Sequence, residues 1–157
     1  MPVPEFVLRL REKIGHDELW MPGITALVFD RQREHLLVVR RADTGEWTPV
    51  TGIIDPGEEP ARAGIREVAE EAGIEVRPIR MIQVHSTPPV VHANGDLARY
   101  LDLCFVFEHV SGEPHPADGE NTQARWAPLA DLPPMRTRFR DQVALALTDR
   151  ADVDFRT

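Results

Sequence analysis

The stretch that decides the fold runs from Gly52 to Ile74 and reads GIIDPGEEPARAGIREVAEEAGI. Its second part is predicted to be a helix of roughly four turns. Pro60 suits the first helical position, and Gly73 suits the position just past the helix end. Glu59 would act as the N-terminal cap, where negative charge is favoured. Four apolar residues recur at helical spacing and are expected to share the face that packs on a core, namely Ala61, Ile65, Val68 and Ala72.

A second face of the same helix carries carboxylates. Glu67, Glu70 and Glu71 fall within an arc of about 100°, and this face is expected to point to solvent and metal rather than to the core. Carboxylates this close repel each other unless a cation lies among them, and oxygen-only ligands suit Mg²⁺ or Mn²⁺. Glu-rich helix faces are more often simply solvated. Here little basic charge lies nearby, and a glycine-containing loop that ends in Glu58 precedes the helix, which together favour a metal site.

The stretch contains a complete family motif. The motif is a glycine, five residues, Glu, seven residues, and then Arg-Glu-aliphatic-any-Glu-Glu-any-Gly-aliphatic. Its defined positions are filled by Gly52, Glu58, Arg66, Glu67, Val68, Glu70, Glu71, Gly73 and Ile74. This is the Nudix box, and over roughly residues 22 to 148 the chain resembles a Nudix hydrolase. The resemblance implies an enzyme that cleaves a nucleoside diphosphate linked to another group, with Mg²⁺ or Mn²⁺ as cofactor.

The resemblance also implies roles for single residues. The metal ligands that it implies are the carbonyl of Gly52 and the carboxylates of Glu67, Glu70 and Glu71. Glu58 and Arg66 resemble the pair that steadies the loop against the helix in this family. Many members read Pro-Gly-Gly where this chain has Val50-Thr51-Gly52. Because the last glycine is kept, the site is expected to survive, with a different backbone path in the loop before it.

The catalytic base is expected at one of two places. In the family it is sometimes a glutamate of the box and often an acid in the loop ahead of a late strand that contains tryptophan. Here that loop holds Glu113, Asp118 and Glu120, and Glu120 stands six residues before Trp126. Glu120 is therefore predicted to be the base or an extra metal ligand, although a solvated loop acid would look the same in sequence. Glu71 is the competing base.

The substrate is less clearly indicated. Pro89 lies sixteen residues after Gly73, a spacing that resembles a mark of ADP-ribose pyrophosphatases, although a proline there would also simply end a strand. Trp47, Tyr100 and Phe105 are candidates for stacking on the base, although core packing is favoured for Phe105, and Arg41 is a further candidate substrate contact. ADP-ribose or a similar nucleotide sugar is favoured. The alternatives are a nucleoside triphosphate or oxidised nucleotide as substrate, and a sensor domain that binds a nucleotide without cleaving it.

Composition narrows the class of protein. With 157 residues, the chain is expected to form a single domain, residues 1–157, in which residues 1–21 are an N-terminal helical extension. A net charge of −8 without a basic stripe argues against binding to duplex nucleic acid. No apolar run is long enough to span a membrane, and no secretory signal begins the chain. A single cysteine, Cys104, is expected to be buried in a strand and fits the cytoplasm.

Periodicity predicts a mixed sheet with helices on its faces, an α/β fold (in the α+β, mixed-sheet sense) that is similar to the Nudix α/β/α sandwich.

The apolar face of the first helix, formed by Phe6, Leu10 and Ile14, has no place in that common fold and motivates a homodimer as a hypothesis. Asn94-Gly95-Asp96 is a hairpin signal. The predicted strands are 23–30, 35–41, a part of 75–86, 97–110 and a short one at 125–126, and the predicted outer helices are 4–15 and 137–147.

Overall fold

Two long strands at the centre of the sheet determine the architecture. β1 (Leu19–Phe29) and β7 (Leu97–Ser111) run parallel, and their pairing extends from Leu19 opposite Ala98 to Phe29 opposite Glu108. Residues 3–155 and 157 are described by the structure, which is a computed structural model. Both strands carry apolar residues on their two faces, as strands do when both faces of a sheet are covered.

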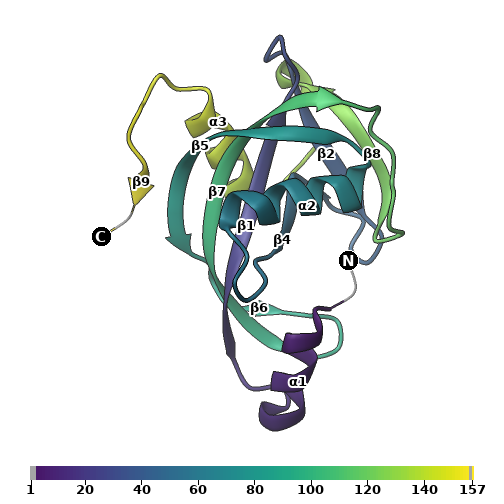
Figure 1. Ribbon diagram of the computed structural model, residues 1–157, viewed down its shortest axis with the longest axis vertical. Helices are drawn as coiled ribbons and strands as arrows, with labels where there is room; N and C mark the ends of the chain where they lie inside the picture. The colour runs from purple at the N-terminus through teal and green to yellow at the C-terminus, as the bar shows by residue number, and fades with distance from the viewer. Residues whose placement is uncertain (1–2, 156) are drawn as a thin grey trace.

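The sheet has nine strands, and its main path follows the order β3-β2-β1-β7-β5-β9 (Figure 1). Off this path, β4 pairs with β1, β6 with β7, and β8 with β2. The remaining strands are β2 (His35–Arg41), β3 (Trp47–Thr48), β4 (Val50–Ile53), β5 (Glu75–Ser86), β6 (Val90–Val91), β8 (Asn121–Pro128) and β9 (Asp154–Phe155).

Helices cover both faces of this sheet. α2 (Pro60–Ala72) packs its Val68 and Ala72 with Ile24 and Phe107 in one core. α3 (Thr137–Ala146) packs its Val143 and Ala146 with Leu27 and Cys104 in a second core on the other face, close to the short 3-10 helix η1 (Leu129–Asp131). The arrangement confirms the predicted α/β/α sandwich.

The buried face of α2 differs from the predicted one. Ala63, Gly64, Val68 and Ala72 are buried, whereas Ala61 and Ile65 are only partly covered. The helix is rotated so that Gly64 faces the sheet, where a Cβ would lie 2.4 Å from Cζ of Phe107. This glycine, which has no side chain to signal a core position, allows the close approach of helix and sheet. The predicted bounds of the helix are confirmed, with Gly73 in the left-handed conformation at φ 66°.

The N-terminal helix packs on its own chain. α1 (Glu5–Ile14) buries Val7 against Met21 and Ala98, and Phe6 lies beside them. Leu10, expected on the buried face, is 38% exposed, because the contact is centred on Val7 one turn earlier. The apolar face of α1 therefore supplies no reason to expect a homodimer.

Several strands extend beyond the predicted limits. β1 begins at Leu19 rather than at residue 23, and β8 spans eight residues where two were predicted. Both additions are stabilised by pairing with distant strands, β7 and β2, that a local pattern does not reveal. Cys104 is buried in β7, as predicted. In the described part of the chain, no helix has both the length and the apolar composition required to cross a membrane.

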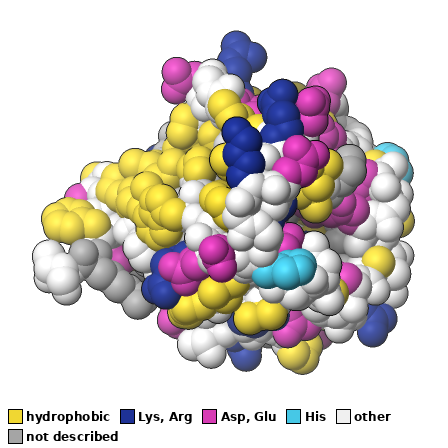
Figure 2. Space-filling view, turned by 90° about the horizontal axis from the view of Figure 1, so that it is seen from below, with side chains coloured by type: hydrophobic (Ala, Val, Ile, Leu, Met, Phe, Trp, Pro, Cys, Tyr) yellow, Lys and Arg dark blue, Asp and Glu magenta, His cyan; other side chains and the backbone are white. Residues whose placement is uncertain are grey.

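Seen from below, hydrophobic side chains gather on one side of the surface (Figure 2). Among all the residues that the structure describes, the most exposed large hydrophobic side chains are those of Val91 at 72% and Phe155 at 71%. They belong to β6 and β9, which are two residues long, and such short strands limit edge-to-edge pairing between molecules.

Replacing Gly64 with Ala is expected to destabilise the protein by about 1–3 kcal/mol, although Ala favours helix formation by about 1 kcal/mol. The reason is that the new methyl group would overlap the buried ring of Phe107. Urea denaturation measures the effect, with Ala69→Ser on the exposed face of the same helix as control. A Gly64→Ala variant that is more stable than the wild type would show that the helix does not depend on this close contact.

Candidate active site

Arg66 connects the loop before α2 to the helix itself. Its Nε and Nη2 donate to the two carboxylate oxygens of Glu58 at 2.8 and 2.7 Å, and Nη2 also donates to the carbonyl of Ile53 at 3.2 Å. Its Nη1 donates to Oε1 of Glu67 at 2.9 Å. These hydrogen bonds hold the pKa of Glu58 below its usual value. The structure thus brings Glu58 and Arg66 together as a bidentate pair, a geometry that fixes orientation as well as distance.

Glu67 lies directly against Gly52 on β4. A Cβ at position 52 would come within 2.1 Å of the Glu67 carboxyl carbon, so only glycine leaves room for this side chain. Glu67 is fully buried, and its Oε2 has no hydrogen-bond partner. Burial raises the pKa of Glu67 to about 8, against the opposing effect of Arg66. A buried oxygen without a partner is costly, and a positively charged ligand is one group that could complete it.

Glu71 is also buried, with 4% of its surface exposed, which corrects the expectation that the acidic face points to solvent. The helix rotation that places Gly64 on the sheet also turns Glu67 and Glu71 inward. Asn121 at the start of β8 donates from Nδ2 to Oε2 of Glu71 at 2.9 Å. Burial raises the pKa of Glu71 to about 7, and the charge of Asp118 adds to the rise.

Asn121 is a site residue that sequence reasoning missed. It follows Glu120 directly, but only acids were considered in this loop. The loop is held on the C-terminal end of α2, where His115 N–H donates to the Ala72 carbonyl at 3.1 Å and Ala117 N–H to the Glu71 carbonyl at 3.3 Å. These bonds satisfy carbonyls that a helix end leaves free. The loop thereby delivers Asn121 and Asp118 to Glu71.

Glu120 lies in the same loop and is partly buried. Its backbone carbonyl accepts a hydrogen bond from Ala42 N–H at 2.8 Å, and its N–H donates to the carboxylate of Asp118 at 3.0 Å. A role for Glu120 as base stays a prediction. Asp118 joins it as a candidate, since its charge acts on Glu71.

The predicted substrate contacts are dispersed. Arg41 forms two hydrogen bonds with Asp43, at 2.9 and 2.8 Å, and its charge also acts on Glu71, so it lies near the site. Trp47 packs with the core under α3, away from α2, and the guanidinium of Arg125 lies 4.7 Å from its ring centre. Pro89 is exposed in the link between β5 and β6. Of the three, Arg41 alone is placed by these contacts beside the acids of α2.

The oxygen atoms around Gly52 suit a hard divalent cation. Glu67 Oε2 and Asn121 Oδ1 are buried without hydrogen-bond partners, and the carboxylate of Glu71 lies one turn from Glu67. Glu70 is more open, with 41% of its side chain exposed and Arg66 Nη1 at 3.5 Å. Within residues 3–155 and 157, no three acidic, His or Cys side chains converge on one point as a ready-made cage. The donor set fits Mg²⁺ or Mn²⁺ by its chemistry, since all its atoms are oxygens.

Sequence relatives act on nucleotide derivatives. The NAD-capped RNA hydrolase NudC of Photobacterium profundum is 32% identical over 109 residues, which cover 68% of this chain and 38% of that protein. The 8-oxo-dGDP phosphatase NUDT18 of Mus musculus is 28% identical over 137 residues, which cover 85% of this chain and 38% of that protein. The chain thus spans about two-fifths of the length of these curated relatives.

Solved structures share the fold. An ADP-ribose pyrophosphatase from Streptococcus suis superposes with a TM-score of 0.64 at 22% identity, covering 86% of this chain and 99% of that one. The NUDIX domain of Shewanella oneidensis NrtR, complexed with ADP ribose, gives 0.61 at 18% identity, covering 93% and 97%. A profile of the NUDIX domain matches residues 19–147. Because this match spans most of the chain, the protein belongs to the Nudix hydrolase family.

Proposed function

We propose that this chain hydrolyses the phosphoanhydride bond of a nucleoside diphosphate linked to another group, with ADP-ribose or a similar nucleotide sugar as the favoured substrate and Mg²⁺ or Mn²⁺ as cofactor. One observation carries the proposal: the buried carboxylate of Glu67, with its Oε2 unpaired, lies against the backbone of Gly52. A buried anion in this state needs a cation, and a cation held by carboxylates can in turn bind phosphate.

The proposed metal ligands are the Gly52 carbonyl and the carboxylates of Glu67, Glu70 and Glu71. When bound there, a divalent ion supplies charge neutralisation and lowers the pKa of a water molecule. The protein groups do the positioning. Arg66 orients Glu67 through its Oε1, and Asn121 orients Glu71 through its Oε2. Glu71, Glu120 or Asp118 would accept the proton from the attacking water.

ADP-ribose is favoured because two structural neighbours that the chain covers almost completely are an ADP-ribose pyrophosphatase and a domain bound to ADP ribose. A second candidate is an oxidised nucleotide, since NUDT18 matches 85% of this chain. Binding without cleavage, as in a sensor, is disfavoured because the acids of the box are all retained and two of them are buried in contact with orienting partners.

The proposal predicts Mg²⁺-dependent hydrolysis of one compound among ADP-ribose, NADH, nucleotide sugars, 8-oxo-dGDP and nucleoside triphosphates. Chromatographic separation of the nucleotide products measures the cleavage, and EDTA should abolish the activity. Tight binding of one compound without cleavage at any Mg²⁺ or Mn²⁺ concentration would instead identify a sensor.

Glu71→Gln is expected to lower turnover at least 100-fold and to stabilise the metal-free protein. The folded-state pKa of Glu71 is raised to about 7, so the wild-type carboxyl costs stability progressively as pH rises from about 4.5 through about 7. Gln carries no charge, so above about pH 8 in EDTA the variant should be more stable by about 1–3 kcal/mol.

Urea denaturation at about pH 5 and about pH 8.5 tests this prediction, with Glu12→Gln on the exposed side of α1 as control. The gain should be much smaller at the lower pH, and at the higher pH it should shrink when Mg²⁺ is added. A variant with normal turnover, or one that loses stability at the higher pH, would contradict the assignment of Glu71.

Gly52→Ala tests the contact between β4 and α2. The added Cβ would displace the Glu67 carboxylate, so the Mg²⁺ concentration for half-maximal activity should rise and turnover should fall about 100-fold. Gly57→Ala is the matched control, because its Cβ meets nothing within 4 Å while its φ of 83° penalises a side chain. That variant should lose roughly 1 kcal/mol of stability and keep its Mg²⁺ requirement. Equal Mg²⁺ requirements in both variants would refute the role of Gly52.

A further inference from the structure

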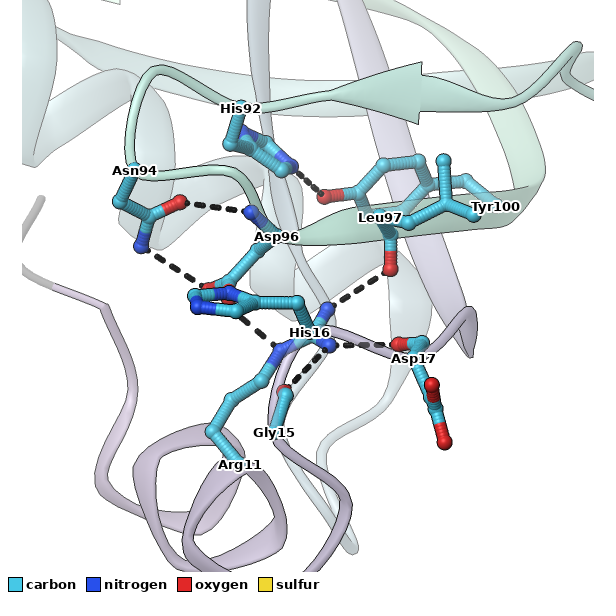
Figure 3. Close-up of polar contacts among 9 residues, drawn as sticks. All are labelled: Arg11, Gly15, His16, Asp17, His92, Asn94, Asp96, Leu97 and Tyr100. Carbon is cyan, nitrogen blue, oxygen red and sulfur yellow. Dashed lines mark hydrogen bonds and ion pairs between the residues drawn. The ribbon is translucent and has the colours of Figure 1, made fainter.

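The end of α1 is tied to the turn between β6 and β7 (Figure 3). Arg11 donates from Nη1 to the carbonyls of Gly15 and Asp17 at 3.1 and 2.6 Å, and from Nη2 to the carbonyl of Leu97 at 2.8 Å. Its Nε lies 3.4 Å from Oδ2 of Asp96, and only 11% of the Arg11 side chain is exposed. One guanidinium therefore connects the N-terminal segment to the start of β7.

The turn between β6 and β7 places His92 in contact with Tyr100. Asp96 is held by His16 at 2.8 Å and by the Asn94 side chain at 2.9 Å, which fixes the turn. His92 Nε2 then lies 3.1 Å from the hydroxyl of Tyr100, and the two rings meet edge to face with centres 6.5 Å apart. The Tyr100 side chain is thus oriented from its hydroxyl end by a segment that Arg11 secures.

Tyr100 lies beside the proposed metal ligand. A Cβ added to Gly23 would be 3.3 Å from the Tyr100 ring and 3.5 Å from the carbonyl oxygen of Gly52, so ring and carbonyl flank the same point on β1. The backbone of Tyr100 is fixed by Thr87, which donates from its N–H to the Tyr100 carbonyl at 2.8 Å and accepts the Tyr100 N–H at 3.0 Å. The ring is therefore placed at the edge of the site.

Arg138 of α3 lies on the face of the sheet to which Tyr100 points, and one nitrogen of its guanidinium donates no hydrogen bond. Tyr100 and Asp102 are two residues apart on β7 and point to one face of the sheet. Arg138 Nη1 lies 3.8 Å from Oδ2 of Asp102, too far for a hydrogen bond, and is buried without a hydrogen-bond partner. Asp102 already accepts hydrogen bonds from Thr25 and Gln142, at 2.8 and 2.9 Å. The Arg138 side chain is 33% exposed.

Burial raises the pKa of Tyr100, and the charges of Arg11, Arg41 and Arg138, from α1, β2 and α3, oppose this rise. Because Tyr100 keeps its proton, it can donate a hydrogen bond to an anion, and Arg138 can do so with a charge-assisted bond.

We propose that Tyr100 and Arg138 form an anchor that binds the phosphate of the substrate that lies farther from the metal, and that Arg11 and His92 act as positioning residues for Tyr100. The inference rests on the proposed function for the identity of the ligand, a diphosphate. A diphosphate carries negative charge on both of its phosphates. The anchor would supply a hydroxyl donor and a guanidinium to the phosphate farther from the carboxylates, and the N-terminal segment outside the matched NUDIX region would become part of substrate binding.

The test is the affinity for α,β-methylene-ADP, whose bridging group cannot be hydrolysed, measured by titration calorimetry with Mg²⁺ present. Tyr100→Phe and Arg138→Gln should each weaken binding roughly 10- to 100-fold, and the double variant should lose less than the product of the two effects, because both groups hold one phosphate. Binding of adenosine, which has no phosphate, should stay unchanged. Arg11→Gln should weaken binding of the analogue by a smaller factor, whereas Arg9→Gln on the same helix is the matched control.

Thermal denaturation identifies any variant that is unfolded. If Arg138→Gln is unfolded, the charge-retaining Arg138→Lys takes its place, and its affinity for the analogue should fall by a smaller factor. A wild-type chain that does not bind the analogue, or Tyr100→Phe and Arg138 variants that bind it as tightly as the wild type does, would overturn the anchor. Failure of the proposed function is a separate result. In that case the wild type cleaves nothing in the substrate panel, while the same variants still lose affinity for the analogue.

Discussion

The guanidinium of Arg66 is the constraint on which the rest of the site depends. It joins the carboxylate of Glu58, the carbonyl of Ile53 and the carboxylate of Glu67, so a loop, a strand and a helix share one planar group. Such a fork fixes angles as well as distances, which a lysine could not do. With Arg66 in place, one oxygen of Glu67 is paired and the other is left unpaired beside Gly52. The buried acids reduce the stability of the metal-free protein, and a divalent cation bound among them would restore it.

The sequence was sufficient for the parts of the fold that depend on local patterns. The bounds of α2, the strand at 35–41 and the buried Cys104 follow from capping residues, apolar runs and composition. The helix face was predicted wrongly because Gly64 has no side chain to mark a core position, and its contact with Phe107 depends on a strand 43 residues away. β8 was predicted too short because its pairing with β2 is nonlocal.

The same distinction applies to the site. Helical spacing predicted the cluster of acids, and the resemblance to the Nudix box implied the Glu58–Arg66 pair, since all of these residues lie within one helix and its preceding loop. Asn121 could not be found in this way. Its contact with Glu71 depends on how the 113–120 loop is hydrogen-bonded to the end of α2, and an asparagine in a polar loop has no distinctive pattern. Trp47, an attractive aromatic in sequence, packs instead under Arg125 on the side of α3.

The alternation of side chains along β7 has an evolutionary consequence. Leu103, Phe105 and Phe107 pack with the apolar residues of α2, whereas Tyr100, Asp102 and Cys104 point to the other face of the sheet. A single strand therefore carries two sets of positions that can mutate separately. A substitution of Tyr100 would change the proposed phosphate anchor and leave the packing of α2 unchanged, whereas substitutions at the first set would disturb that packing. A shift of register by one residue would exchange the two sets, so insertions in β7 should be far rarer among descendants than substitutions.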